Sequence, residues 1–76
     1  MKIYKVWQDD VRGYDTYSEC VIIAEGINQA KRISIDQLSH DGYCWTEYID
    51  RVHAKELGTA NEDCGPGVVC ASFHAG

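Results

Sequence analysis

The sequence predicts an α+β fold with two layers, in which a four-stranded, mostly antiparallel sheet carries one helix packed on one face. Two observations lead to this prediction. Four short segments rich in β-branched, aromatic or other apolar residues are separated by polar or glycine-containing turns, and a segment with helical spacing lies between the second and the third. Because 76 residues fit one small domain, we expect residues 1–76 to form a single unit in the order β-β-α-β-β.

The first two predicted strands are joined by a polar loop. Residues 2–7 combine lysines with β-branched and aromatic residues, which is typical of a partly exposed strand. Residues 17–24 give the strongest strand signal, because three consecutive β-branched residues leave neither face of the strand clearly polar. The intervening residues 8–15 hold several aspartates and Gly13, so we expect a hairpin loop there.

A helix is expected to begin at Ile27. Gly26 stands at the N-cap position, and Gln29 follows three residues later, where its side chain can return a hydrogen bond as in a capping box. The face expected to pack on the sheet consists of three apolar residues at a spacing of three: Ile27, Ala30 and Ile33. Asp36 points away from this face, and the helix is expected to end within residues 34–40.

The carboxyl-terminal part is expected to supply two further strands joined by a hairpin. Residues 43–51 hold aromatic residues without clear periodicity, which fits a loop, a helical turn or a short strand, and we assign them to a loop. Residues 52–58 alternate as a half-exposed strand does, and residues 59–67 are rich in turn formers. Residues 68–73 are apolar apart from Ser72, which favours an interior position in the sheet.

These elements restrict how the sheet is assembled. A right-handed crossover through the helix places strands 17–24 and 52–58 parallel in direction. We expect the strand order 17–24, 2–7, 68–73, 52–58, and the order 2–7, 17–24, 68–73, 52–58 is the alternative. Because one helix covers only one face of a sheet with two strands apolar on both sides, we expect the second face to meet another subunit or a partner. A homodimer through this face or an edge strand is expected.

Charge and apolar patterning narrow the classes of function. Twelve acidic residues against seven basic ones give a net charge of −5 and an isoelectric point near 4.9. This balance opposes direct binding to nucleic acid or to an anionic membrane and favours a positively charged protein partner. No segment approaches about 18 apolar residues, and the first ten residues lack the apolar run of a signal peptide, so we expect a cytoplasmic protein.

The sequence contains no recognisable catalytic or metal-binding motif. The cysteines, at positions 20, 44, 64 and 70, lack the two-residue separation of zinc and redox motifs, so we expect free thiols in a reducing compartment. Cys70 and His74 are four residues apart on a predicted strand, which separates them by about 13 Å, too far for a shared ion. No glycine-rich loop follows the first strand to hold a phosphate. We expect a protein that is not an enzyme and that has no cofactor and no metal.

Two groups of residues are candidates for partner binding. The first group is acidic: Asp9, Asp10 and Asp15 crowd the first hairpin, and the later loops hold Glu47, Asp50, Glu62 and Asp63. These carboxylates either imitate the phosphates of a nucleic acid or form a solvated acidic surface. Trp45 and Tyr48 lie in the predicted loop and have the side chains that most often anchor protein interfaces. The alternative for Trp45 is a small core in which it packs against the sheet.

Two stretches of the chain resemble segments of a known class of small proteins. The first covers residues 1–33, from MKIYKVWQDD through GYDTYSECVIIAEGINQAKRI, and the second is GVVCASFHAG at the carboxyl end. The stretches resemble small bacteriophage and prophage proteins that inhibit bacterial defence, and the middle of the chain has no counterpart. The matching positions have no motif role, so no functional residue is carried over from the resemblance.

The closest functional class within this resemblance is the anti-CRISPR proteins that act on type I systems. The resemblance implies a phage-encoded inhibitor that acts in the cytoplasm of the host bacterial cell, binds the type I surveillance complex (Cascade) and blocks its access to target DNA. The net charge of the chain adds acidic mimicry of nucleic acid as the binding mode. The alternative function is a small module that binds a small ligand, a signalling nucleotide or a metal ion.

Overall fold

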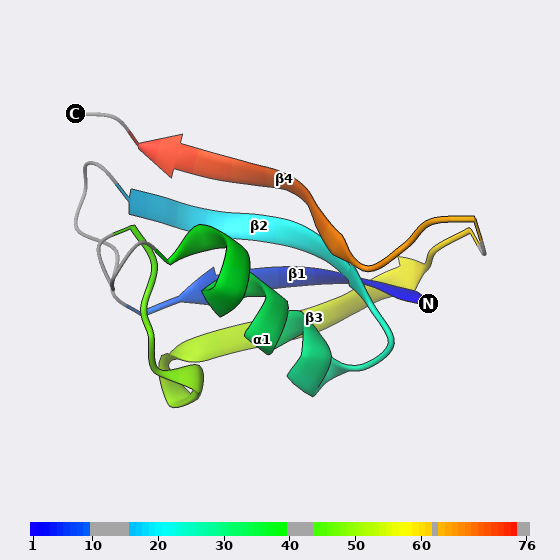
Figure 1. The fold of residues 1–76 in the computed structure, drawn as a ribbon, viewed down its shortest axis with the longest axis horizontal. Coiled ribbons are helices and arrows are strands. Elements are labelled where there is room, and N and C mark those ends of the chain that lie inside the picture. Colours follow the sequence, from blue (N-terminus) through cyan, green and yellow to red (C-terminus); the bar gives the residue numbers. More distant parts are fainter. Residues whose placement is uncertain (10–15, 40–43, 62, 75–76) are drawn as a thin grey trace.

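A computed structural model describes residues 1–9, 16–39, 44–61 and 63–74 of the chain (Figure 1). Its elements, in chain order, are β1 (Lys2–Gln8), β2 (Thr16–Ala24), α1 (Ile27–Leu38), the short 3₁₀ helix η1 (Ile49–Arg51), β3 (Val52–Thr59) and β4 (Gly67–His74). Each strand extends its predicted range by one residue at one end or at both. The predicted fold class is confirmed: four antiparallel strands form one open sheet, and α1 packs on one face of it (Figure 1).

The strand order is β3-β1-β2-β4, so both predicted orders are wrong. Both of them joined the last two strands as a hairpin, whereas these strands lie at opposite edges of the sheet. Residues 60–66 carry the chain from one edge to the other, and the Ala60 N–H donates a hydrogen bond of 2.9 Å to the Met1 carbonyl on the way. The prediction that β2 and β3 run parallel in direction is confirmed, because each is antiparallel to β1 between them.

β4 lies at an edge and not in the interior that its apolar sequence favours. It pairs only with β2, and the register places Val21 opposite Cys70 and Ile22 opposite Val68. Val69 is therefore an extra residue, a β-bulge, and its side chain is 60 % exposed. The apolar run does not bury both sides of the strand because the bulge directs one of its members into solvent.

α1 begins at Ile27 after Gly26, as predicted, and the Gln29 side chain accepts a hydrogen bond of 2.5 Å from the Glu25 N–H. Its buried face differs from the predicted one, since Ile27 is 44 % exposed. The residues of α1 that are buried follow a spacing of four: Ala30, Ser34 and Leu38. A serine fits this face because its hydroxyl is fully hydrogen-bonded, donating to the Lys31 carbonyl at 2.6 Å.

The core lies between α1 and the sheet face below it. The alternate residues of β1 and β2 that face the helix meet four apolar residues from other parts of the chain. The buried core residues are Tyr4, Val6, Cys20, Ile22, Ala24, Ala30, Leu38, Trp45 and Val52. The residues of β1 and β2 that alternate with them point to the opposite side of the sheet, which no described element covers.

Candidate partner-binding surface

The segment between α1 and β3 is held to the sheet by the side chain of Gln8, at the end of β1. Gln8 is only 4 % exposed. Its Nε2 donates to the carbonyls of Tyr17 and Cys44, at 2.7 and 3.2 Å, and its Oε1 accepts from the Thr46 N–H at 2.7 Å. One buried amide therefore joins the end of β1, the start of β2 and the segment that follows α1. No pattern in the sequence indicates this role for a single glutamine.

Trp45 holds the same segment to the helix. The side chain is 1 % exposed, and its Nε1 donates a hydrogen bond of 3.0 Å to the hydroxyl of Ser34. The expectation that Trp45 anchors a partner is therefore corrected, because a side chain at this depth has no surface left to offer. The alternative, in which Trp45 packs in a small core against the sheet, is confirmed.

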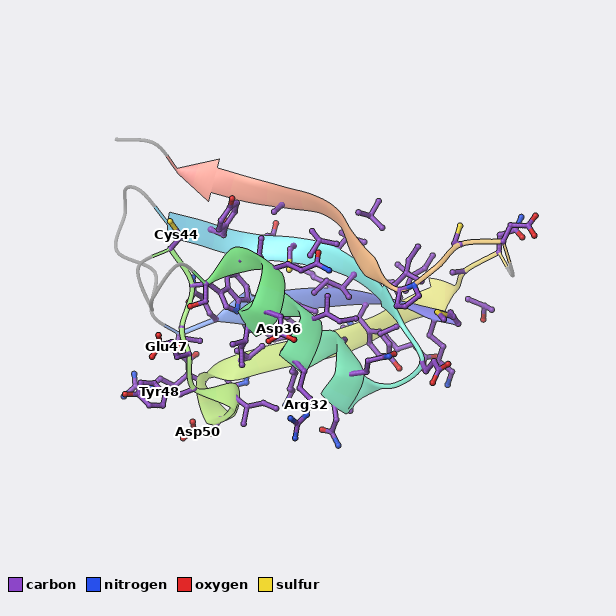
Figure 2. The ribbon with its side chains drawn as sticks, viewed as in Figure 1. Arg32, Asp36, Cys44, Glu47, Tyr48 and Asp50 are labelled. Carbon is purple, nitrogen blue, oxygen red and sulfur yellow. The ribbon has the colours of Figure 1, made fainter. Side chains whose placement is uncertain are left out.

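Trp45 and Thr46 are both buried. The four residues that follow them, Glu47 to Asp50, form what we call the presenting loop. All four side chains are exposed, with Tyr48 64 % and Ile49 39 % accessible. The Tyr48 N–H donates to Thr46 Oγ1 at 3.1 Å, and the Arg51 N–H donates to the Tyr48 carbonyl at 3.0 Å. The loop is preceded by the buried Thr46 and is followed, after the exposed Arg51, by the buried Val52. A fixed base therefore displays the exposed ring of Tyr48 (Figure 2) and the exposed aliphatic side chain of Ile49.

Three carboxylates lie on or beside the presenting loop. Glu47 and Asp50 come from the presenting loop itself, and Asp36 comes from the neighbouring face of α1 (Figure 2). In the part of the chain that the structure describes, none of the three makes an ion pair or a side-chain hydrogen bond. The surface therefore carries unpaired negative charge beside exposed apolar groups, a combination suited to a basic protein partner.

A shallow groove of about 330 Å³ runs between α1 and the presenting loop. Two isoleucines form its apolar part, and two acids and one arginine form its polar part. The lining residues are Arg32, Ile35, Asp36, Glu47 and Ile49. The volume is at the lower end of the range for small-molecule sites, and the groove is open, which suits a side chain of a partner better than an enclosed ligand.

The acids of the first hairpin are not part of this surface as far as the structure describes them. Asp9 lies beside β3, where both of its carboxylate oxygens are within 3.0 Å of His53 Nε2. His53 in turn stacks on Trp7 with the ring centroids 5.8 Å apart. Asp10 and Asp15 lie outside the described residues. Of the residues predicted to bind a partner, Tyr48 and the acids Glu47 and Asp50 lie in the presenting loop.

The sequence reasoning missed Asp36 as a member of this surface and Gln8 and Ser34 as its supports. A signal for the surface was present: a run of acidic and large apolar residues, Glu47 to Asp50, begins two positions after a tryptophan. No comparable signal marks the supports, since a polar residue in a strand or helix is normally expected at the surface.

The cysteines and other potential ligands are dispersed. Cys20 is buried, Cys44 is half-buried and Cys64 is exposed. Within residues 1–9, 16–39, 44–61 and 63–74, no three side chains of histidine, cysteine, aspartate or glutamate are grouped so that they could hold a metal ion. The described residues also include no helix long and apolar enough to cross a membrane. Comparison of the chain with protein-family models, with curated proteins and with solved structures finds no match.

Proposed function

We propose that this protein is a non-enzymatic inhibitor that binds a basic surface of a protein complex through the presenting loop and Asp36. The observation that carries the proposal is the exposure of Tyr48 and Ile49 on a fixed base, next to three carboxylates that have no partner among the described residues. The partner that we propose is a type I CRISPR surveillance complex, whose DNA-binding channel must be basic to hold phosphates. The resemblance of the two ends of the chain to phage anti-defence proteins supports this choice.

The two kinds of side chain in the surface have different tasks. Carboxylates attract a basic channel over a distance of about 8 to 10 Å in physiological salt and orient the approach. Tyr48 and Ile49 act only at contact, where burial of their apolar area supplies short-range affinity. Because Gln8 and Trp45 already fix the loop, little conformational freedom is lost on binding.

Acidic mimicry explains why such a protein blocks access to DNA without touching DNA itself. A net charge of −5 repels phosphates, so the protein and the target DNA compete for the same cations of the complex. The inhibitor needs no reaction under this mechanism, and its potency depends on occupancy alone.

A plasmid-interference assay tests this proposal. Cells that carry a type I system and a targeted plasmid are compared with and without this gene, and we expect plasmid establishment to be restored when the protein is present. Tyr48→Ala should lose most of the inhibition. The control Leu57→Ala, which truncates a 55 % exposed side chain on β3, should keep it. Unchanged interference across the type I subtypes would refute the proposed partner.

A further inference from the structure

We propose that a second copy of this chain docks on the sheet face opposite α1, so that the protein forms a two-fold dimer. This inference concerns a different surface and goes beyond the proposed function. We call this surface the open face. Its described members are Ile3, Lys5 and Trp7 of β1, Glu19, Val21 and Ile23 of β2, and His53 and Lys55 of β3.

The apolar part of the open face is continuous across the two central strands. Ile3 lies opposite Ile23, and Trp7 lies opposite Glu19 on one side and His53 on the other. Directly opposite residues of antiparallel strands share one face, so their side chains are neighbours. Ile3, Trp7, Val21 and Ile23 all keep part of their surface in solvent. Covering this surface is favourable by the hydrophobic effect.

The charges of the open face select a second copy over a charged partner. Lys5 pairs with Glu19 at 3.2 Å, and His53 pairs with Asp9 at 2.9 Å. Lys55 is the described cation of this face that has no such pair. The face is thus close to neutral, whereas unpaired carboxylates gather around the presenting loop. Two copies that each carry a charge of −5 repel each other least when they approach through the neutral face.

The edges of the sheet are poor sites for the same association. β3 has a bulge at Leu57, where Ile3 pairs with Gly58 and Tyr4 with Glu56, and β4 has its bulge at Val69. A bulge interrupts the row of free N–H and C=O groups that another strand needs for pairing. Of the two modes of dimerisation expected from the sequence, the structure therefore favours the face.

The size of the open face sets the expected affinity. Four strands at a spacing of about 4.8 Å, each about seven residues long at about 3.3 Å per residue, give a flat footprint of roughly 440 Å² per copy. Protruding side chains add to this area, which brings the pair close to the lower limit of about 1,200 Å² for a specific interface. We therefore expect a dissociation constant in the micromolar range. The presenting loops remain exposed on the outer sides of both copies, which makes the dimer bivalent.

Sedimentation equilibrium between about 1 and 300 µM tests the dimer. The mass should rise from 8.5 kDa towards twice that value with concentration. Ile23→Glu places a charge in the open face and should hold the mass at that of one chain. The matched control Ile27→Glu makes the same change at an exposed position in the first turn of α1, where an acid suits the helix dipole, and should leave the dimer intact. Equal self-association of the two variants, or a monomer throughout for the parent, would overturn the inference.

Tryptophan quenching locates the interface without a substitution, and it decides the matter if Ile23→Glu does not fold. Trp45 is 1 % exposed, so acrylamide quenching of the parent reports on Trp7. Quenching should fall over the concentration range in which the mass doubles. Unchanged quenching over that range would place the interface elsewhere and refute the proposal. Added salt should strengthen the dimer by screening the repulsion between copies, while it weakens partner binding, so the two proposals fail separately.

Discussion

The indole N–H of Trp45 donates a hydrogen bond of 3.0 Å to the hydroxyl of Ser34, which joins the base of the presenting loop to the middle of α1. The Ser34 hydroxyl in turn donates a hydrogen bond of 2.6 Å to the Lys31 carbonyl, so the indole is connected to the backbone of α1. Both side chains are buried, so neither group can exchange its partner for water. The position of the exposed Tyr48 therefore depends on a polar contact inside the core.

Ser34→Ala tests this contact. The substitution should lower the free energy of unfolding by about 1 to 2 kcal/mol, because a buried N–H left without an acceptor outweighs the roughly 0.5 kcal/mol that alanine gains in a helix. Urea denaturation followed by circular dichroism measures the difference. In a Trp45→Phe background the same substitution should cost little, since the donor is already absent. An equal cost in both backgrounds would show that the contact has no energetic role.

Gln8→Met tests the connection between the sheet and the presenting loop. The variant should lose roughly 2 to 3 kcal/mol of unfolding free energy, because the Thr46 N–H and two carbonyls lose their hydrogen bonds. Hydrogen exchange should show the largest gain in rate at the Thr46 amide. Gln37→Met is the control, since that exposed side chain makes a single 3.3 Å hydrogen bond, to the Val68 N–H. If both variants are equally stable, the role assigned to Gln8 is wrong.

Glu56 raises the pKa of Lys2 above its usual value of 10.5, by a side-chain hydrogen bond first and by its charge second. The two groups are 3.0 Å apart and both are exposed. Because the folded chain favours the protonated lysine, any stability from the pair is present at neutral pH and is lost as the pH rises through the raised pKa. In an NMR titration, Glu56→Gln should lower the pKa of Lys2. An unchanged pKa of Lys2 in this variant would contradict the pairing.

The elements were predictable because each has a local signal. Residues 52–58 alternate in sequence as a strand does, and Gly26 marks the start of α1. One helix covers only one face of a sheet, and two of the predicted strands are apolar on both sides. An uncovered second face was therefore predictable from the sequence. These inferences depend only on neighbouring residues, which is why the fold class could be predicted.

The strand order and the surface were not predictable because they depend on distant contacts. The bulge at Val69 makes an edge strand out of an apolar run, and no local pattern distinguishes it from a buried strand. The burial of Trp45 depends on a serine 11 positions earlier and on a glutamine in β1. Serine and glutamine are expected at the surface, so the residues that turn Trp45 inward resembled surface residues in the sequence.

The acids of the first hairpin are the other site that the sequence predicts for the proposed partner. Replacing Asp9, Asp10 and Asp15 together by asparagine and serine removes three negative charges at the other predicted position. We expect this variant to bind a purified type I surveillance complex more tightly than a variant that lacks the carboxylates of Glu47 and Asp50. The reverse ranking, measured by titration of the complex, would move the binding surface to the hairpin.

The most direct test of the account is the affinity of the purified complex for two variants of equal net charge, measured at low and high ionic strength. Glu47→Gln with Asp50→Asn removes the acids of the presenting loop, and Glu25→Gln with Asp63→Asn removes two exposed acids outside it. The loop variant should bind at least about tenfold more weakly at low salt, a loss of about 1.4 kcal/mol, and should depend less on salt than the parent. The control should bind within about twofold of the parent. Equal affinity and equal salt dependence of the two variants would contradict the central claim that the presenting loop binds the partner.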